Sequence, residues 1–136
     1  MTKDIMVEAL KPLLKKNNFK KTRTTWHKVI EDFILVINVQ GSQWGEDYYI
    51  NLGVYFKALG TELNPPENLC HIQARLAHED KSVEAIVEEA INWLNTYGNI
   101  SVLESLHREN KLPPMTFVKA KEYLDSRLHL RENKEM

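Results

Sequence analysis

The sequence has a single cysteine, Cys70, in 136 residues, so no disulfide can form within the chain. A lone thiol fits a reducing compartment. Long apolar runs are also absent: the longest, residues 33–37, is about a quarter of the ~20 residues that a helix needs to span a bilayer. The first residues lack the apolar core of a signal peptide and carry an acid, Glu8, inside an amphipathic pattern. We therefore expect a cytoplasmic protein with no membrane association.

The usual signatures of catalytic and metal chemistry are missing as well. No glycine-rich phosphate loop occurs, and the histidines show neither HExxH nor CxxC spacing. These histidines are His27, His71, His78, His107 and His129. Cys70 and His71 are neighbours in a predicted strand, so they would point to opposite faces and could not form a nucleophile–base pair. Cys70 is expected in the core beside Ile72. No metal, cofactor or catalytic residue is expected, and the balance is against an enzyme.

Positive charge is scarce in the middle of the chain. Residues 1–30 carry eight lysines and arginines against two acids, whereas residues 31–110 carry four against thirteen. Such segregation can mark a basic docking patch. The alternative is that the first helix simply has a solvated lysine face. The acidic remainder and a pI near 6.5 disfavour nucleic-acid binding.

The apolar periodicities predict one α+β domain over residues 1–130, with a frayed tail at 131–136. An N-terminal helix is expected over residues 3–17, with Thr2 as its N-cap and Asn17-Asn18 as its end. A four-stranded antiparallel meander follows, with strands at about 23–30, 33–40, 48–57 and 70–76. The clearest helical stripe starts at Val83, after a cap at Asp80 or Ser82, and ends at Gly98. Shorter helices are expected at about 101–110 and 116–128, giving the order α-β-β-β-β-α-α-α.

Side chains alternate across a strand, so parity sorts the strand residues by face. The residues of one parity are apolar, and we expect them to pack under the helices. If Glu31-Asp32 forms a two-residue turn, Trp26 pairs with Ile37 and Arg23 with Gln40. The polar members of the other face are then Arg23, Thr25, His27, Asn38, Gln40, Tyr49, Asn51, Tyr55, His71, Gln73 and Arg75.

This second face has two interpretations. Antiparallel sheets commonly keep one face wet or covered by the chain itself, and a polar face then needs no ligand. Amides, tyrosines, histidines and arginines are nevertheless groups suited to directional hydrogen bonding and stacking. Gly53, in mid-strand, indicates close approach by another backbone or a ligand. Trp44, in a glycine-containing loop, either folds back over the sheet edge or anchors a partner.

Several stretches together resemble a bacterial family of uncharacterised proteins, domain of unknown function 4304. They are residues 10–14, 40–45, 49–55 and 70–75, of which 49–55 is the most specific. The resemblance spans roughly residues 5–95, and one departure is Asn18, where the family's pattern has glycine. It implies a self-standing small domain and supplies no activity. Small families of this α+β kind sometimes prove to be immunity partners of toxins, which is an analogy at the level of the fold alone.

The leading hypothesis is a non-enzymatic binding module, immunity-type or regulatory, that holds a protein partner through the polar face and the Trp44 loop. The binding residues expected are Arg23, His27, Gln40, Trp44, Tyr49, Asn51, Tyr55, His71 and Arg75. The alternative is a binder of a small anionic ligand or nucleic acid through Arg23, His27, His71 and Arg75. An enzyme of unknown class is the third hypothesis, and the oligomeric state stays open.

Overall fold

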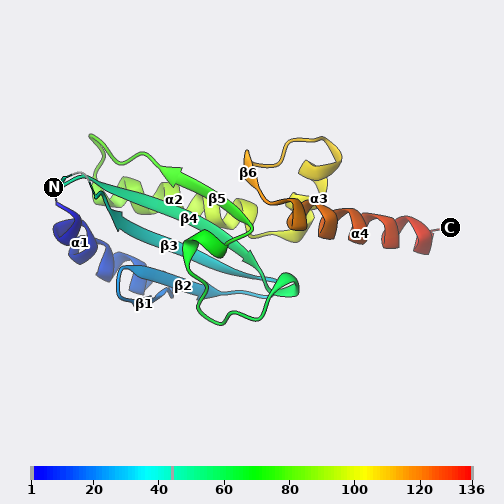
Figure 1. Ribbon diagram of the computed structural model, residues 1–136, viewed down its shortest axis with the longest axis horizontal. Coiled ribbons are helices and arrows are strands. Elements are labelled where there is room, and N and C mark those ends of the chain that lie inside the picture. Colours follow the sequence, from blue (N-terminus) through cyan, green and yellow to red (C-terminus); the bar gives the residue numbers. More distant parts are fainter. Residues whose placement is uncertain (1, 44, 136) are drawn as a thin grey trace.

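The structure is a computed structural model that describes residues 2–43 and 45–135, with side chains to residue 132. Within these residues it has one six-stranded antiparallel sheet in the order β1-β2-β3-β4-β5-β6, with α-helices α1 to α4 (Figure 1). The strands are β1 (Lys20–Thr22), β2 (Thr25–Val29), β3 (Phe33–Gly41), β4 (Tyr48–Phe56), β5 (Ile72–Leu76) and β6 (Met115–Thr116). The helices are α1 (Lys3–Lys16), α2 (Val83–Tyr97), α3 (Ile100–Arg108) and α4 (Val118–Glu135), with short 3₁₀ turns η1 (Lys57–Leu59) and η2 (Glu67–Leu69). The α+β class and the flanking helices are confirmed, but the expected four strands are six.

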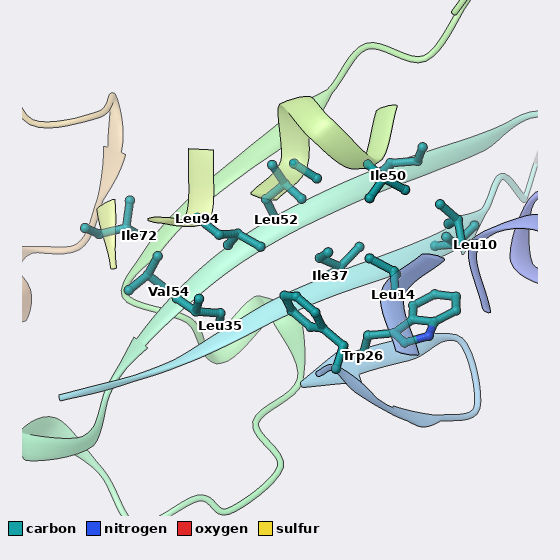
Figure 2. Packing of buried hydrophobic residues seen from close by; sticks show 14 of the residues in the cluster. Leu10, Leu14, Trp26, Leu35, Ile37, Ile50, Leu52, Val54, Ile72 and Leu94 are labelled. Atoms are coloured by element: carbon teal, nitrogen blue, oxygen red, sulfur yellow. The ribbon is translucent and has the colours of Figure 1, made fainter. Parts of the chain in front are cut away.

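The hydrophobic core lies between one face of the sheet and the helices, mainly α1 and α2, with Leu103 of α3 and Ala120 and Leu124 of α4 also part of it. Alternate residues of β3 and β4, such as Leu35, Ile37 and Leu52, are buried on this core face. Figure 2 shows Leu10 and Leu14 of α1 packed near Trp26 and Ile37. The apolar side chains of the strands and those of the helices thus bury one another. Neither set could be removed from water without the other.

The ends of α1 and α2 follow from their capping residues. The Oγ1 of Thr2 accepts a hydrogen bond from the Ile5 N–H, and the Oγ of Ser82 accepts one from the Ala85 N–H. Asn18 adopts a left-handed conformation with φ 69° after α1, which asparagine tolerates better than most residues. This turn brings the buried Phe19 back against the helix end.

The first predicted strand is split in two. The expected Glu31-Asp32 turn and the pairing of Trp26 with Ile37 are both confirmed. The chain reverses, however, at Arg23, whose φ is 57°, and β1 pairs back onto β2 with Thr22 opposite Thr25. The predicted pairing of Arg23 with Gln40 is therefore wrong. Two polar threonines flank this turn, and no glycine signals it in the sequence.

The C-terminal region adds β6 and a longer last helix than expected. β6 places Thr116 opposite Ile72 and so becomes one of the sheet's two edge strands. Helix α4 continues to Glu135 and extends away from the sheet (Figure 1); fraying of its end stays a prediction. Glu104 of α3 is only 2% exposed and lies 3.4 Å from Arg127 Nε and 2.9 Å from Arg131 Nη1 of α4. These ion pairs hold the two helices together.

Candidate functional site

The second face of the sheet is divided into a closed half and an open half. Residues 57–71, hereafter the covering loop, cross this face opposite α1 and α2 (Figure 1). Beneath the loop, Ile34, Val36 and Tyr55 form a small buried cluster with Cys70. The closed half is therefore a second, smaller core.

Hydrogen bonds and close packing fix the covering loop. The Nε2–H of His27 donates to the Pro65 carbonyl at 2.7 Å, and the Tyr55 hydroxyl accepts from the Glu62 N–H at 3.1 Å. Gln73 donates through Nε2 to the carbonyl of Asn68 at 3.2 Å. Bonds to β2, β4 and β5 thus tie the loop to three strands.

Gly53 is needed because Cys70 packs directly on it. A Cβ at Gly53 would lie 2.5 Å from the Sγ of Cys70 and 2.7 Å from its Cβ. The close approach expected at this glycine is therefore made by the chain's own side chain. Cys70 is buried, as expected, but on the second face and not with Ile72 in the main core. Strand parity failed here because Cys70 is the C-cap of η2 and lies outside β5, which begins two residues later at Ile72.

Three expected binding residues are buried in the closed half. His27, Tyr55 and His71 are 7%, 3% and 6% exposed. The Nδ1 of His71 accepts a hydrogen bond from the Phe56 N–H at 2.9 Å, which requires the unprotonated ring nitrogen. Burial, reinforced by the charge of Lys119, lowers the pKa of His71. These residues stabilise the fold, and a ligand cannot reach them while the loop is in place.

The open half is crossed by one row of hydrogen-bonded side chains, hereafter the polar row. Thr25, Asn38, Asn51 and Arg75 are register partners on four successive strands. Arg75 Nε donates to Asn51 Oδ1 at 3.2 Å, and Asn51 Nδ2 donates to Asn38 Oδ1 at 3.2 Å. Asn38 Nδ2 then donates to the Thr25 hydroxyl at 2.9 Å. Every bond of the row runs in the same direction, from the arginine towards the threonine.

The polar row orients two exposed side chains, Arg75 and Gln40. Asn51, only 2% exposed, also donates through Nδ2 to Gln40 Oε1 at 3.0 Å. Because the amide oxygen of Gln40 faces the row, its amino group is directed away from it. The guanidinium carbon of Arg75 lies 4.0 Å from the centroid of the Tyr49 ring, a stacking arrangement that fixes the plane of its donors. The open half thus presents fixed hydrogen-bond donors to solvent.

A groove of about 470 Å³ adjoins this surface, where β4 starts and β5 ends. Its wall includes Tyr48 and His78, whose rings stack with centroids 4.2 Å apart. His78 Nε2–H donates to the Tyr48 carbonyl at 3.0 Å. Asp47 and Glu79 line the same groove. Tyr48 and His78 were not predicted as site residues, because one has core parity and the other lies outside the predicted strands.

The remaining expected site residues lie elsewhere. Arg23 is exposed in the β1–β2 turn and does not join the polar row. Trp44 lies outside the described residues. Of the nine residues expected to bind, the structure brings together Gln40, Tyr49, Asn51 and Arg75.

The described residues contain no group of three or more His, Cys, Asp or Glu side chains that could hold a metal ion. Cys70 and His71 are not bonded to each other: the thiol faces the Pro66 carbonyl at 3.8 Å, and the imidazole accepts from Phe56. Burial, with the charge of Glu67, raises the pKa of the Cys70 thiol, so the reactive thiolate is disfavoured. Among the described helices, none is both long and apolar enough to cross a membrane.

Comparison with known proteins identifies a family and nothing closer. The sequence model of a family described as a domain of unknown function, DUF4304, matches residues 10–107. This range covers α1 from Leu10, strands β1 to β5, α2 and most of α3. No curated protein and no solved structure matches the chain.

Proposed function

Since this chain belongs to the DUF4304 family of domains of unknown function, its role has to be argued from its own surface, and we propose that it is a non-enzymatic binding module for a protein partner. The recognition surface is the open half of the second face, with Arg75, Gln40 and Tyr49 as the contacting residues. The covering loop and the helices occupy the other large surfaces of the sheet, so this half remains for a partner.

The observation that carries the proposal is the polar row. Asn51 is buried and uses both amide hydrogens and its oxygen on neighbouring side chains. Holding Arg75 and Gln40 in one geometry lowers the entropy lost when a partner binds. Arginine and tyrosine are also the residue types that dominate binding energy at protein interfaces.

The chemistry of the surface indicates what the partner presents. Arg75 and Gln40 offer N–H donors, so the complementary groups are acceptors: a carboxylate for the guanidinium fork, and a carbonyl for the amide. The partner segment is therefore one with an exposed Asp, Glu or terminal carboxylate. The single buried thiol fits a cytoplasmic setting, which is part of the proposal.

A small free anion is less well supported at this surface. The adjoining groove contains the carboxylates Asp47 and Glu79 beside Arg75, and His27 and His71 are both buried. The cationic residues predicted to bind a small anion, which also included Arg23, do not come together in the fold.

The test is site-specific photo-crosslinking in cells of the source organism. A photoreactive amino acid replaces Ala77, which is exposed and lines the groove beside Arg75. We expect a discrete cross-linked partner that falls roughly tenfold or more when Arg75→Glu is added. Arg108→Glu, at an exposed arginine of α3, is the matched control and should leave the product unchanged. Products that survive Arg75→Glu unchanged would remove the proposal.

A further inference from the structure

A second concave site lies between the end of α1 and the β1–β2 hairpin, and shares no residue with the polar row. This groove, of about 600 Å³, is lined by Lys11, Lys15, Lys20 and Lys21, with Phe19 and Trp26 at its base. Its volume lies within the range of roughly 300–1,000 Å³ that small-molecule sites occupy. Hereafter it is called the lysine groove.

Phe19 and Trp26 lie beneath the lysine groove and are only 5% and 1% exposed, so its accessible apolar surface comes mainly from Pro12 and the lysine stems. Phe19 is positioned there by the left-handed turn at Asn18, and Trp26 by its place in β2. Lysines lie over both rings: Lys21 Nζ is 5.8 Å from the Trp26 centroid, and Lys28 Nζ is 5.8 Å from that of Phe19. Lysine stems cover apolar surface while their ammonium groups stay in water. The groove therefore combines an apolar interior with a charged rim.

The charge of the rim is nearly uncompensated. None of the residues that line the groove is acidic. Glu8 pairs with Lys11 at 2.7 Å, and Lys11, with a smaller contribution from Lys21, lowers the pKa of that carboxyl. Lys15, Lys20 and Lys21 form no ion pair with any described residue. Three ammonium groups thus remain around an apolar hollow, in the one strongly basic part of the chain.

We propose that the lysine groove binds a free amphiphilic anion: an apolar chain or ring with one carboxylate, sulfate or phosphate head. The apolar part lies against Pro12 and the lysine stems, above the buried Phe19 and Trp26, and the head lies among Lys15, Lys20 and Lys21. A simple polyanion would gain from the charges but would leave the apolar surface unused. A neutral or cationic amphiphile would use the apolar surface but would forgo or oppose the charges.

The experiment titrates the whole chain with butanoate, hexanoate and octanoate, and follows backbone and indole N–H signals by ¹H–¹⁵N NMR. Octan-1-ol, octyltrimethylammonium, inorganic phosphate and a single-stranded oligonucleotide are the comparison probes. The groove variant is Lys15→Glu/Lys21→Glu. The control, Lys111→Glu/Lys121→Glu, changes two exposed lysines and has the same net charge. Thermal unfolding of each variant shows that it is folded.

We expect saturable shifts around residues 11–26, with affinity rising roughly two- to fourfold for each methylene that enters the groove. The groove variant should bind octanoate roughly tenfold more weakly, and the control should bind as wild type does. Equal affinity for butanoate and octanoate would overturn the proposal, as would equal binding of octanoate and octyltrimethylammonium. Tighter binding of phosphate or the oligonucleotide than of octanoate would show that charge alone acts, and would overturn it too. Since none of these variants touches Arg75, the outcome is independent of the proposed protein partner.

Discussion

Replacing Gly53 by alanine tests how the covering loop closes half of the sheet. The new Cβ would lie 2.5 Å from the Cys70 Sγ and 2.7 Å from its Cβ, so one of the two residues must move. Cys70 is fully buried among Ile34, Val36 and Tyr55 and has little room to shift. Overpacking of this kind costs about 1–3 kcal/mol, and removing the glycine from a strand returns about 0.5–1 kcal/mol. The expected net loss in the free energy of unfolding is about 1 kcal/mol, and at most about 2.5 kcal/mol.

Urea denaturation followed by circular dichroism gives this value, and a double-mutant cycle assigns its cause. In a Cys70→Gly background both clashing atoms are absent, so Gly53→Ala should become neutral or stabilising, with a coupling of at least about 1 kcal/mol. Gly41→Ala is the control, because its Cβ would meet only the flexible side chain of Lys3, at 3.3 Å. Additive effects of the two substitutions would refute the contact between Gly53 and Cys70 as the reason for the glycine.

Three further predictions concern buried polar groups. In the folded chain the pKa of His71 lies below its ordinary 6.5, so the unfolded chain binds the proton more readily. The free energy of unfolding should therefore fall as pH drops through about 6.5. In denaturation measured from pH 8 to 5, His71→Asn should flatten this dependence. Asn51→Leu removes three side-chain hydrogen bonds and should cost about 2 kcal/mol in the same assay; an unchanged midpoint would contradict the polar row. Arg127→Ala/Arg131→Ala leaves the buried Glu104 carboxylate without its ion-pair partners and should cost about 3 kcal/mol of stability. Glu104→Gln should cost only about 1 kcal/mol, because both arginines stay partly hydrated. Thermal melts in which the glutamine variant is the less stable of the two would contradict this.

The core face could be predicted from the sequence because its pattern is local. Alternation in residues 33–40 and 48–57, and the 3.6-residue stripe of α2, each specify a buried side without knowledge of the other. The Glu31-Asp32 turn then set the register between β2 and β3, which the structure confirms. The breaks at Arg23 and at Cys70 were missed, because each depends on a backbone turn that no glycine marks.

The candidate site was predicted only in part, because parity assigns a face but not what covers it. His27, Tyr55 and His71 were assigned to the same face as Arg75, yet the covering loop packs over His27 and Tyr55, and His71, its last residue, is itself buried. The proline pair at 65–66 indicated a loop, but not that its carbonyl would reach His27. Exposure of the second face therefore depended on tertiary contacts, which strand periodicity does not encode.

Strand β6 was not predicted from the sequence, for a related reason. Two residues, Met115 and Thr116, follow a proline pair and carry no alternation of their own. Their pairing with β5 is specified by the sheet edge that β5 leaves open. Such short edge strands arise from the surrounding structure, and local propensity has little part in them.

The central claim, that one half of the second face is closed and the other open, is tested most directly by the reactivity of two thiols in one molecule. The variant Gln40→Cys carries a cysteine in the open half together with the native Cys70 in the closed half. With a chromogenic disulfide reagent at pH 8, one equivalent should react at the rate of an exposed thiol. The second should react at least roughly 100-fold more slowly, because Cys70 is buried and must await opening of the loop. In denaturant both should react at once. Two equivalents reacting at the same fast rate in the folded protein would contradict the claim.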